Sequence, residues 1–184
     1  MKKRSVFFSF LLFLAGMALT SAAQEQPASS VPVDPDTKKI TYREVVNENG
    51  TPGYLYDKGI EWFRYYYVNP ISVYNVQDRT NARIEGTGRI KLYYFEPDGT
   101  RREGVQIQYA IRMEFKDNRY RYTITDFLLK TASRYPLENW LNKADPSYNP
   151  QWDAYLYQID TTMVRLVATM KEKMKPTVQK TDEW

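Results

Sequence analysis

Residues 83–129 read RIEGTGRIKLYYFEPDGTRREGVQIQYAIRMEFKDNRYRYTITDFLL, and this stretch carries the strongest structural signal in the chain. Apolar and polar side chains alternate with a period of two, apart from short breaks at EPDGT (96–100) and KDN (116–118). A sheet with one buried face and one wet face requires this alternation. The breaks contain residues that favour turns. We therefore predict long antiparallel strands joined by two hairpin turns.

Two glycines, Gly86 and Gly88, fall on the face that the alternation turns toward the core. The motif Gly86-Thr-Gly88 lacks the third glycine and the strand-to-helix context of a dinucleotide site, so it does not indicate nucleotide binding. A glycine on the inward face of a strand permits a sharp bend or the close approach of a bulky side chain. We expect a residue such as Trp62 to approach the strand there.

The flanking segments predict two more strands and two helices. Strand-forming residues occupy 39–46, and a short strand is expected at 71–76. In residues 54–67 and 151–174 the apolar residues recur every three or four positions, which is helical spacing. The order β-α-β-β-β-β-α predicts an α+β fold of two layers, a curved antiparallel sheet with both helices on its apolar face. We expect a single domain over residues 38–175.

The two ends of the chain read as segments outside this domain. Residues 1–23 contain three cations, an apolar run of about 14 residues and a small-residue site, which predicts a secretory signal peptide cut near Ala23. That run is shorter than the roughly 20 residues that span a bilayer, although a retained anchor stays open as the alternative. Residues 24–37 predict a flexible leader and 176–184 a disordered tail. The protein is expected in the periplasm or at the cell surface.

Composition excludes several classes of chemistry. The 184 residues include no histidine and no cysteine, which rules out thiol nucleophiles, imidazole bases, disulfides, zinc fingers and iron–sulfur clusters. We expect no cofactor and no metal site. The net charge is +4, but residues 1–23 hold three of the 26 basic residues and no acid, which leaves 23 bases against 22 acids after cleavage. A charge near +1 does not indicate nucleic-acid binding.

The polar face of the predicted sheet is basic and is the candidate binding surface. Its bases are Arg83, Arg89, Lys91, Arg112, Arg119 and Arg121, and its acids are Glu85 and Glu114. A net charge of +4 on a concave face would attract an acidic polymer, an anionic glycan or an acidic partner. Alternatively, these side chains pair across the strands and serve solubility alone. Both interpretations stay open here.

Three acids are candidates for other chemistry. Asp126 continues the inward alternation of the third long strand, so it could be a buried carboxylate of a hydrolase that uses two carboxylates. The alternative is that Asp126 lies at the end of the strand and caps a turn or pairs with a cation. Asp34 and Asp36 could hold calcium, but they lack the oxygen spacing of a loop site, and a charged tether is the default.

Several stretches resemble a known family. They are 31–34 (VPVD), 40–46 (ITYREVV), 61–63 (EWF), 86–88 (GTG), 119–127 (RYRYTITDF) and 136–140 (PLENW). In these stretches the chain resembles the domain of unknown function 4468 family, which consists of exported proteins of Gram-negative bacteria. The resemblance implies a fold like the TATA-box-binding protein, a curved antiparallel sheet backed by helices. It implies no catalytic motif, and similarity of fold does not transfer DNA binding.

These observations support three functional hypotheses. The first is a non-enzymatic exported module of the cell envelope, which binds an envelope protein or an anionic ligand through the polar sheet face or the loop 131–150. The second is a glycan hydrolase that uses carboxylates only, and the third is a structural subunit of a surface assembly. We expect no nucleic-acid partner and no transmembrane span after signal cleavage.

Overall fold

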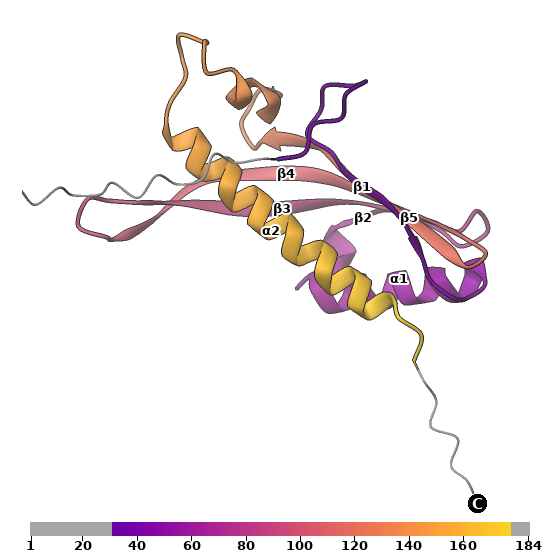
Figure 1. Cartoon of the computed structure of the whole chain (residues 1–184). Helices are drawn as coiled ribbons and strands as arrows, with labels where there is room; N and C mark the ends of the chain where they lie inside the picture. The colour runs from indigo at the N-terminus through magenta and orange to yellow at the C-terminus, as the bar shows by residue number, and fades with distance from the viewer. Residues whose placement is uncertain (1–30, 178–184) are drawn as a thin grey trace, which may run out of the picture.

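The computed structural model describes residues 31–177 of the chain (Figure 1). The predicted signal peptide, residues 24–30 of the leader and residues 178–184 of the tail lie outside the described residues. The strands are β1 (Tyr42–Asn47), β2 (Tyr74–Asp78), β3 (Arg83–Phe95), β4 (Arg101–Lys116), β5 (Arg119–Leu129) and β6 (Tyr135–Pro136). The α-helices are α1 (Pro52–Tyr66) and α2 (Gln151–Met174), and two short 3-10 helices, η1 (Pro70–Ser72) and η2 (Leu137–Leu141), complete the elements.

The strands form one antiparallel sheet in the order β1-β5-β4-β3-β2, with β6 paired to β5. The long strands are paired so that apolar side chains lie opposite apolar side chains. Ile84 pairs with Met113 and Ile111 pairs with Ile124, and all four are almost completely buried. Period-two alternation thus produced the expected meander, with one face turned inward.

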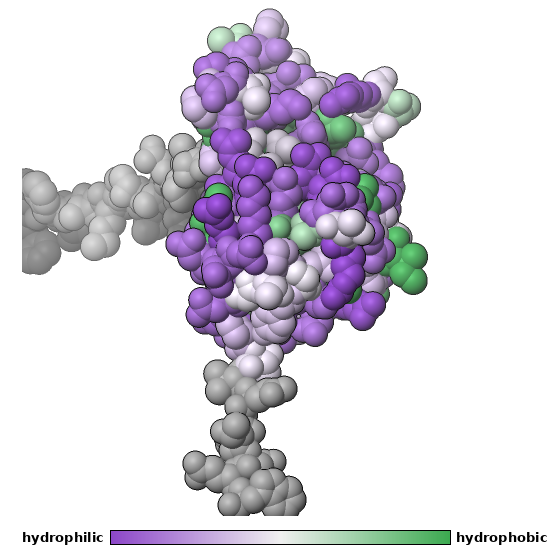
Figure 2. Space-filling model, turned by 90° about the vertical axis from the view of Figure 1, so that its right-hand side faces the viewer, coloured by the Kyte–Doolittle hydropathy of each residue, from purple (hydrophilic) through white to green (hydrophobic). Residues whose placement is uncertain are grey.

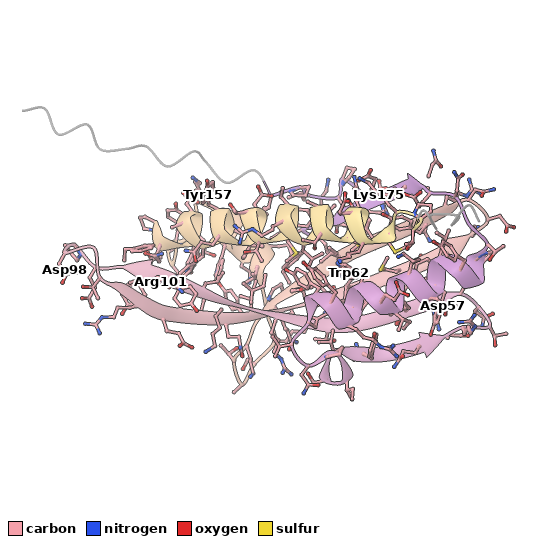
Figure 3. The ribbon with its side chains drawn as sticks, turned by 90° about the horizontal axis from the view of Figure 1, so that it is seen from below. Asp57, Trp62, Asp98, Arg101, Tyr157 and Lys175 are labelled. Carbon is pink, nitrogen blue, oxygen red and sulfur yellow. The ribbon has the colours of Figure 1, made fainter. Side chains whose placement is uncertain are left out.

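Both helices cover the apolar face of this sheet, and α2 crosses it diagonally (Figures 1 and 3). The Thr51 hydroxyl accepts a hydrogen bond from the Tyr54 N–H and caps α1, while Pro52 occupies the first turn, where no N–H partner is required. Leu55 of α1 and Ile159 of α2 are buried in the same core. The predicted two-layer α+β architecture with a curved sheet is confirmed.

One predicted strand is wrong in its first half. Residues 70–72 form η1 instead, and β2 begins only at Tyr74. Pro70 has a fixed φ and lacks an N–H, and its carbonyl accepts a hydrogen bond from the Val73 N–H at 3.0 Å, so the chain turns here. Ile71 is 84% exposed as a result, whereas the β-branched residue had suggested a strand.

The segment predicted as a loop contains two short elements that tie it to the body. β6 pairs Pro136 with Leu128 of β5, and η2 follows it directly. Leu137 and Trp140 are buried and attach this segment to the body of the domain. β6 was missed because a two-residue strand has no period, and its pairing depends on where β5 lies.

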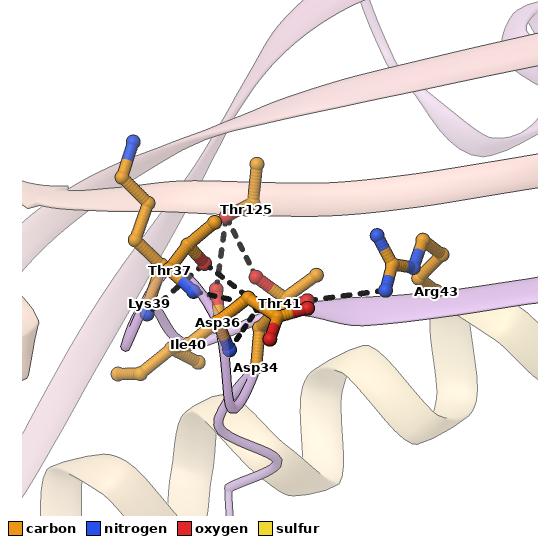
Figure 4. A network of polar contacts seen from close by, with 8 residues as sticks. All are labelled: Asp34, Asp36, Thr37, Lys39, Ile40, Thr41, Arg43 and Thr125. Carbon is orange, nitrogen blue, oxygen red and sulfur yellow. Dashed lines mark hydrogen bonds and ion pairs between the residues drawn. The ribbon is translucent and has the colours of Figure 1, made fainter.

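The flexible leader was predicted to extend to residue 37, but residues 31–37 fold onto the sheet. Val33 forms an antiparallel bridge with Ile40, and Val31 is 7% exposed. Asp34 is the anchor of this turn (Figure 4). The folded unit therefore includes residues 31–37, which the prediction had placed in the leader. The proline-rich composition did not predict this packing, because it favours an extended chain whether or not that chain packs against a surface.

Gly88 and Gly86 permit close packing, but the residue that approaches is not the predicted Trp62. A Cβ atom at Gly88 would overlap the ring of Tyr109, its partner on β4. A Cβ atom at Gly86 would lie 2.9 Å from the Val73 carbonyl oxygen and 3.2 Å from the Phe63 ring. Bulky groups do approach both glycines closely, as expected. Which groups these are depends on the register of β3 with β4 and on the position where α1 ends.

Candidate binding face

The open face is defined here as the side of the sheet turned away from both helices. It carries the outward side chains of β1, β3, β4 and β5. A hollow of about 350 Å³, called here the main hollow, lies in it. The charged residues around this hollow are Arg43, Glu85, Arg112, Glu114, Arg121 and Asp126. A second hollow of about 200 Å³ adjoins it, sharing Glu114 and Arg121 and adding Arg119 and Lys116. The six predicted bases thus belong to one surface, and three of them line these hollows.

The strand register arranges the charges of the open face in rows across the sheet. The rows are Arg83–Glu114–Arg121 and Glu85–Arg112–Thr123. Arg112 Nε lies 2.8 Å from Glu85 Oε1, and Arg121 Nη2 lies 2.7 Å from Glu114 Oε2. Side chains opposite each other on neighbouring strands are close enough for such pairs, and each pair contributes a few tenths of a kcal/mol to about 1 kcal/mol. The sequence left open whether the bases pair across the strands, and these two do.

Two of the predicted bases have no acidic partner within residues 31–177. Arg83 reaches Glu85 at 3.7 Å and Lys91 reaches Glu103 at 2.9 Å, but Arg89 and Arg119 make no ion pair there. Both side chains are exposed, one on each side of the main hollow along the strands. Both are therefore free to receive an anion from outside.

Two further cations on this face were not among the predicted site residues. Arg43 of β1 lines the main hollow, and Lys116 of β4 lines its neighbour. Period two in β1, where Tyr42 faces the core, could have identified Arg43 as outward-facing. What sequence could not show is that β1 pairs with β5, which brings Arg43 opposite Thr123.

Asp126 lies on the open face and not in the core. β5 carries an extra residue relative to β4 between the pairs Gln108–Leu128 and Ala110–Thr125, which is a β-bulge. Asp126 has φ +52°, a left-handed conformation that interrupts the strand, and Phe127 is buried in its stead. The inward position considered for Asp126 is therefore wrong, since the bulge reverses the alternation.

The carboxylates of the main hollow are each held by a cation. Lys39 Nζ lies 2.6 Å from Asp126 Oδ1, which confirms the predicted pairing of this acid with a nearby base. Glu85 and Glu114 are held by the arginines opposite them. The three acids thus face bases across the hollow and do not face one another. The hollow therefore presents arginine N–H groups beside carboxylates that are already paired.

Asp34 organises the amino-terminal turn. Its Oδ1 accepts hydrogen bonds from the Thr37 N–H at 2.9 Å, the Asp36 N–H at 3.1 Å and the Thr37 hydroxyl, and its Oδ2 accepts one from Arg43 (Figure 4). These donors, first the Thr37 N–H, hold the pKa of Asp34 below its ordinary value. The calcium hypothesis for Asp34 and Asp36 finds no support in this turn, since protein donors occupy the Asp34 oxygens.

Asp34→Asn is expected to lower the melting temperature by a few degrees at pH 7, because the amide cannot replace the ion pair with Arg43. The pKa of Asp34 is lowered in the folded state. Its contribution to the stability of the fold is therefore complete above the unfolded pKa of about 4, and it is lost as the pH falls through the folded pKa. Calorimetry from pH 2 to 7 should show the two curves converging in acid. Asp36→Asn is the control; an equal effect there, or a pH-independent difference, would contradict this account.

Two other surfaces bear on the candidate site. The loop at 131–150, the other predicted binding segment, borders a hollow of about 300 Å³ lined by residues of β5 and by Lys130 to Arg134. Figure 2 views the end of the molecule where α1 begins, and its surface is mainly hydrophilic with small separate apolar groups.

No helix in residues 31–177 is long and apolar enough to cross a membrane.

The comparisons with known proteins agree with this architecture. The family model described as a domain of unknown function (DUF4468) with TBP-like fold matches residues 42–130. A crystal structure of a DUF4468 family protein from Bacteroides ovatus is 18% identical, with a TM-score of 0.57, over 81% of this chain and 93% of that chain. A TBP-like protein from Parabacteroides distasonis is 14% identical, with a TM-score of 0.54, over 77% and 97%. No curated protein matches the chain.

The matched range runs from the first residue of β1 to just beyond β5, and it includes α1. It contains all six predicted bases of the open face. At these identities the two crystal structures establish the fold only, and they agree on its class. Over residues 42–130 the chain matches the DUF4468 family model with its TBP-like fold, so the resemblance noted in its sequence is confirmed.

Proposed function

We propose that the protein is an exported, non-enzymatic binding module that holds an anionic partner on the open face of its sheet. The observation that carries the proposal is the placement of Arg89 and Arg119, two exposed cations without an acidic partner within residues 31–177, on either side of a hollow. Arg112 and Arg121 present further N–H groups between them. Export rests on the signal-peptide features of residues 1–23.

Electrostatics explains how this face selects its partner. Arginines that already pair with a glutamate keep a defined orientation, and they still direct other N–H groups outward. The acids of the face neutralise only part of its basic charge, so a positive potential extends from it and attracts anions. The interaction should weaken as salt is added, because the face is exposed and the Debye length is about 8 Å at physiological ionic strength.

The double variant R89E/R119E is expected to bind immobilised poly-L-glutamate at least tenfold more weakly than the wild type at low salt. It reverses two charges without breaking an ion pair between described residues, so the fold should persist. R64E/R165E makes the same change in net charge on α1 and α2, at two exposed arginines, and should change binding by less than about twofold. Circular dichroism checks that both variants are folded.

Equal losses in the two variants would show that net charge, and not the open face, governs binding. Unchanged binding in R89E/R119E would remove the face from consideration. The protein for this assay is isolated from its own cells. If it is exported, it should be found in the cell envelope, and its amino terminus should be Gln24. Cytoplasmic protein that retains residues 1–23 would overturn that part of the proposal.

A further inference from the structure

The edge of β3 beyond the end of β2 lacks a neighbouring strand. β2 pairs with β3 only at Arg83–Gly86, and the last bond on this side runs from the Thr87 N–H to the Val73 carbonyl at 2.8 Å. β3 continues for eight more residues to Phe95, paired with β4 on its other side. Figure 3 shows the β3–β4 hairpin extending well past β2 toward Asp98 and Arg101.

Between Thr87 and Tyr93 the backbone N–H and C=O groups on this edge of β3 make no hydrogen bonds with the described residues. In an antiparallel strand, alternate residues direct their N–H and C=O groups to the same side, so Thr87, Arg89, Lys91 and Tyr93 share the side away from β4. At Tyr93 the side chain of Gln158 replaces a strand, since it accepts from the N–H at 3.0 Å and donates to the C=O at 2.7 Å. Arg89 and Lys91, between these points, have no such partner among residues 31–177.

The side chains beside this gap indicate the chemistry of what would fill it. Arg89 and Lys91 both point to the open face, where a residue on an added strand would lie about 5 Å away between Cβ atoms. Two cations disfavour pairing with the same edge of a second copy, because like charges would then lie opposite each other. They favour a strand that carries Asp or Glu at those positions.

Apolar surface adjoins the same edge. Val68 is fully exposed and Ile71 is 84% exposed, in the turn that connects α1 to β2. Val68 and Arg89 both line a hollow of about 170 Å³, together with Tyr67, Val73 and Thr87. A strand alternates its side chains between two faces, so a segment with acids on one side can place apolar residues near this turn. Edge protection by charge alone does not account for these exposed apolar side chains.

We propose that the edge of β3 between Thr87 and Tyr93 receives an extended, acidic segment of a partner protein as an additional strand in line with β2. This inference rests on the proposed function and specifies the form of the anionic partner. The segment donates to and accepts from the Arg89 and Lys91 backbone, and its acidic side chains pair with the same two residues. The distance from Thr87 to Tyr93 is about 20 Å, which accommodates a segment of about five residues.

The test uses a capped hexapeptide of alternating Glu and Val and its copy with N-methyl groups on the amides that would face β3. The two peptides have the same charge, but the second cannot donate to the edge. The full mature protein is expected to bind the methylated peptide at least tenfold more weakly. On adding the unmodified peptide, the Arg89 and Lys91 amides should become protected from hydrogen exchange.

A protein variant tests the same edge from the other side. Lys91→Pro removes the edge N–H without removing a bond to β4, and Lys91→Gln removes the charge but keeps the N–H. Binding of the unmodified peptide should be weaker in Lys91→Pro than in Lys91→Gln. If Lys91→Pro does not fold, the peptide pair still decides the matter, since it leaves the protein unchanged.

The outcomes separate this inference from the proposed function. Equal affinity for both peptides, with binding to poly-L-glutamate still lost in R89E/R119E, would overturn the edge and leave the binding face standing. Protection of the Arg89 and Lys91 amides without peptide, together with a dimeric mass, would identify a second copy as the occupant and overturn the acidic segment. Failure to bind either peptide or poly-L-glutamate would overturn both.

Discussion

Trp62→Ala is expected to lower the free energy of unfolding by about 3–5 kcal/mol, the range for removing a large aromatic side chain from a core. Trp62 of α1 is completely buried, and Figure 3 shows it between α1 and α2. Its ring lies 5.0 Å from that of Phe63 and 5.5 Å from that of Tyr66, and its N–H donates to Thr169 of α2. Truncation would leave a cavity between α1, α2 and the sheet.

Urea denaturation followed by circular dichroism measures this effect. Tyr65→Ala is the matched control, because Tyr65 is an aromatic residue of the same helix that is 62% exposed. It should cost no more than about 1 kcal/mol, mostly through the loss of its cation–π contact with Lys173. A cost below about 1 kcal/mol for Trp62→Ala would mean that α1 and α2 are not packed as the structure has them.

Gly88→Ala is expected to destabilise the protein by about 2–3 kcal/mol, although alanine is intrinsically better than glycine within a strand. The new methyl group would overlap the Tyr109 ring, which covers Gly88 from β4. Tyr109 has little room to move, because it is 2% exposed, its hydroxyl is hydrogen-bonded to that of Tyr67 at 3.1 Å, and Phe127 packs beside it.

A double-mutant cycle identifies the cause. In a Tyr109→Leu background the Gly88→Ala substitution should cost less than about 1 kcal/mol, since the overlapping ring is gone. Gly53→Ala is the control, because the nearest atom to its added Cβ would be an arginine nitrogen 3.7 Å away, and it should be close to neutral. If Gly88→Ala costs the same in both backgrounds, the overlap with Tyr109 is not the reason.

The period of the hydrophobic pattern was sufficient for the major elements. Alternation from residue 83 to 129 required an antiparallel meander, and a spacing of three or four required α1 and α2. These signals are local, because each residue's side of a strand or helix depends on its position within that element. The candidate binding face followed from the same alternation, since the bases that it turned outward do share one surface.

The signals failed where a residue's partner lies far along the chain. The turn at 31–37 is followed by Lys39, which pairs with the distant Asp126, and β6 exists only because β5 lies beside it. The alternation suggested an inward position for Asp126, which is wrong since a bulge adds one residue and reverses the alternation after it. Neither the donors of a turn nor the extra residue of a bulge has a periodic signature.

The period of apolar residues thus determined the layers, the strand order within the meander and the outward direction of the basic side chains. Only the tertiary structure decided which base meets which acid, which cations stay free and where β3 loses its neighbour. The physical reason is that ion pairs and sheet edges depend on register between strands. Register is a property of two segments packed together, and a single segment's pattern contains only half of it.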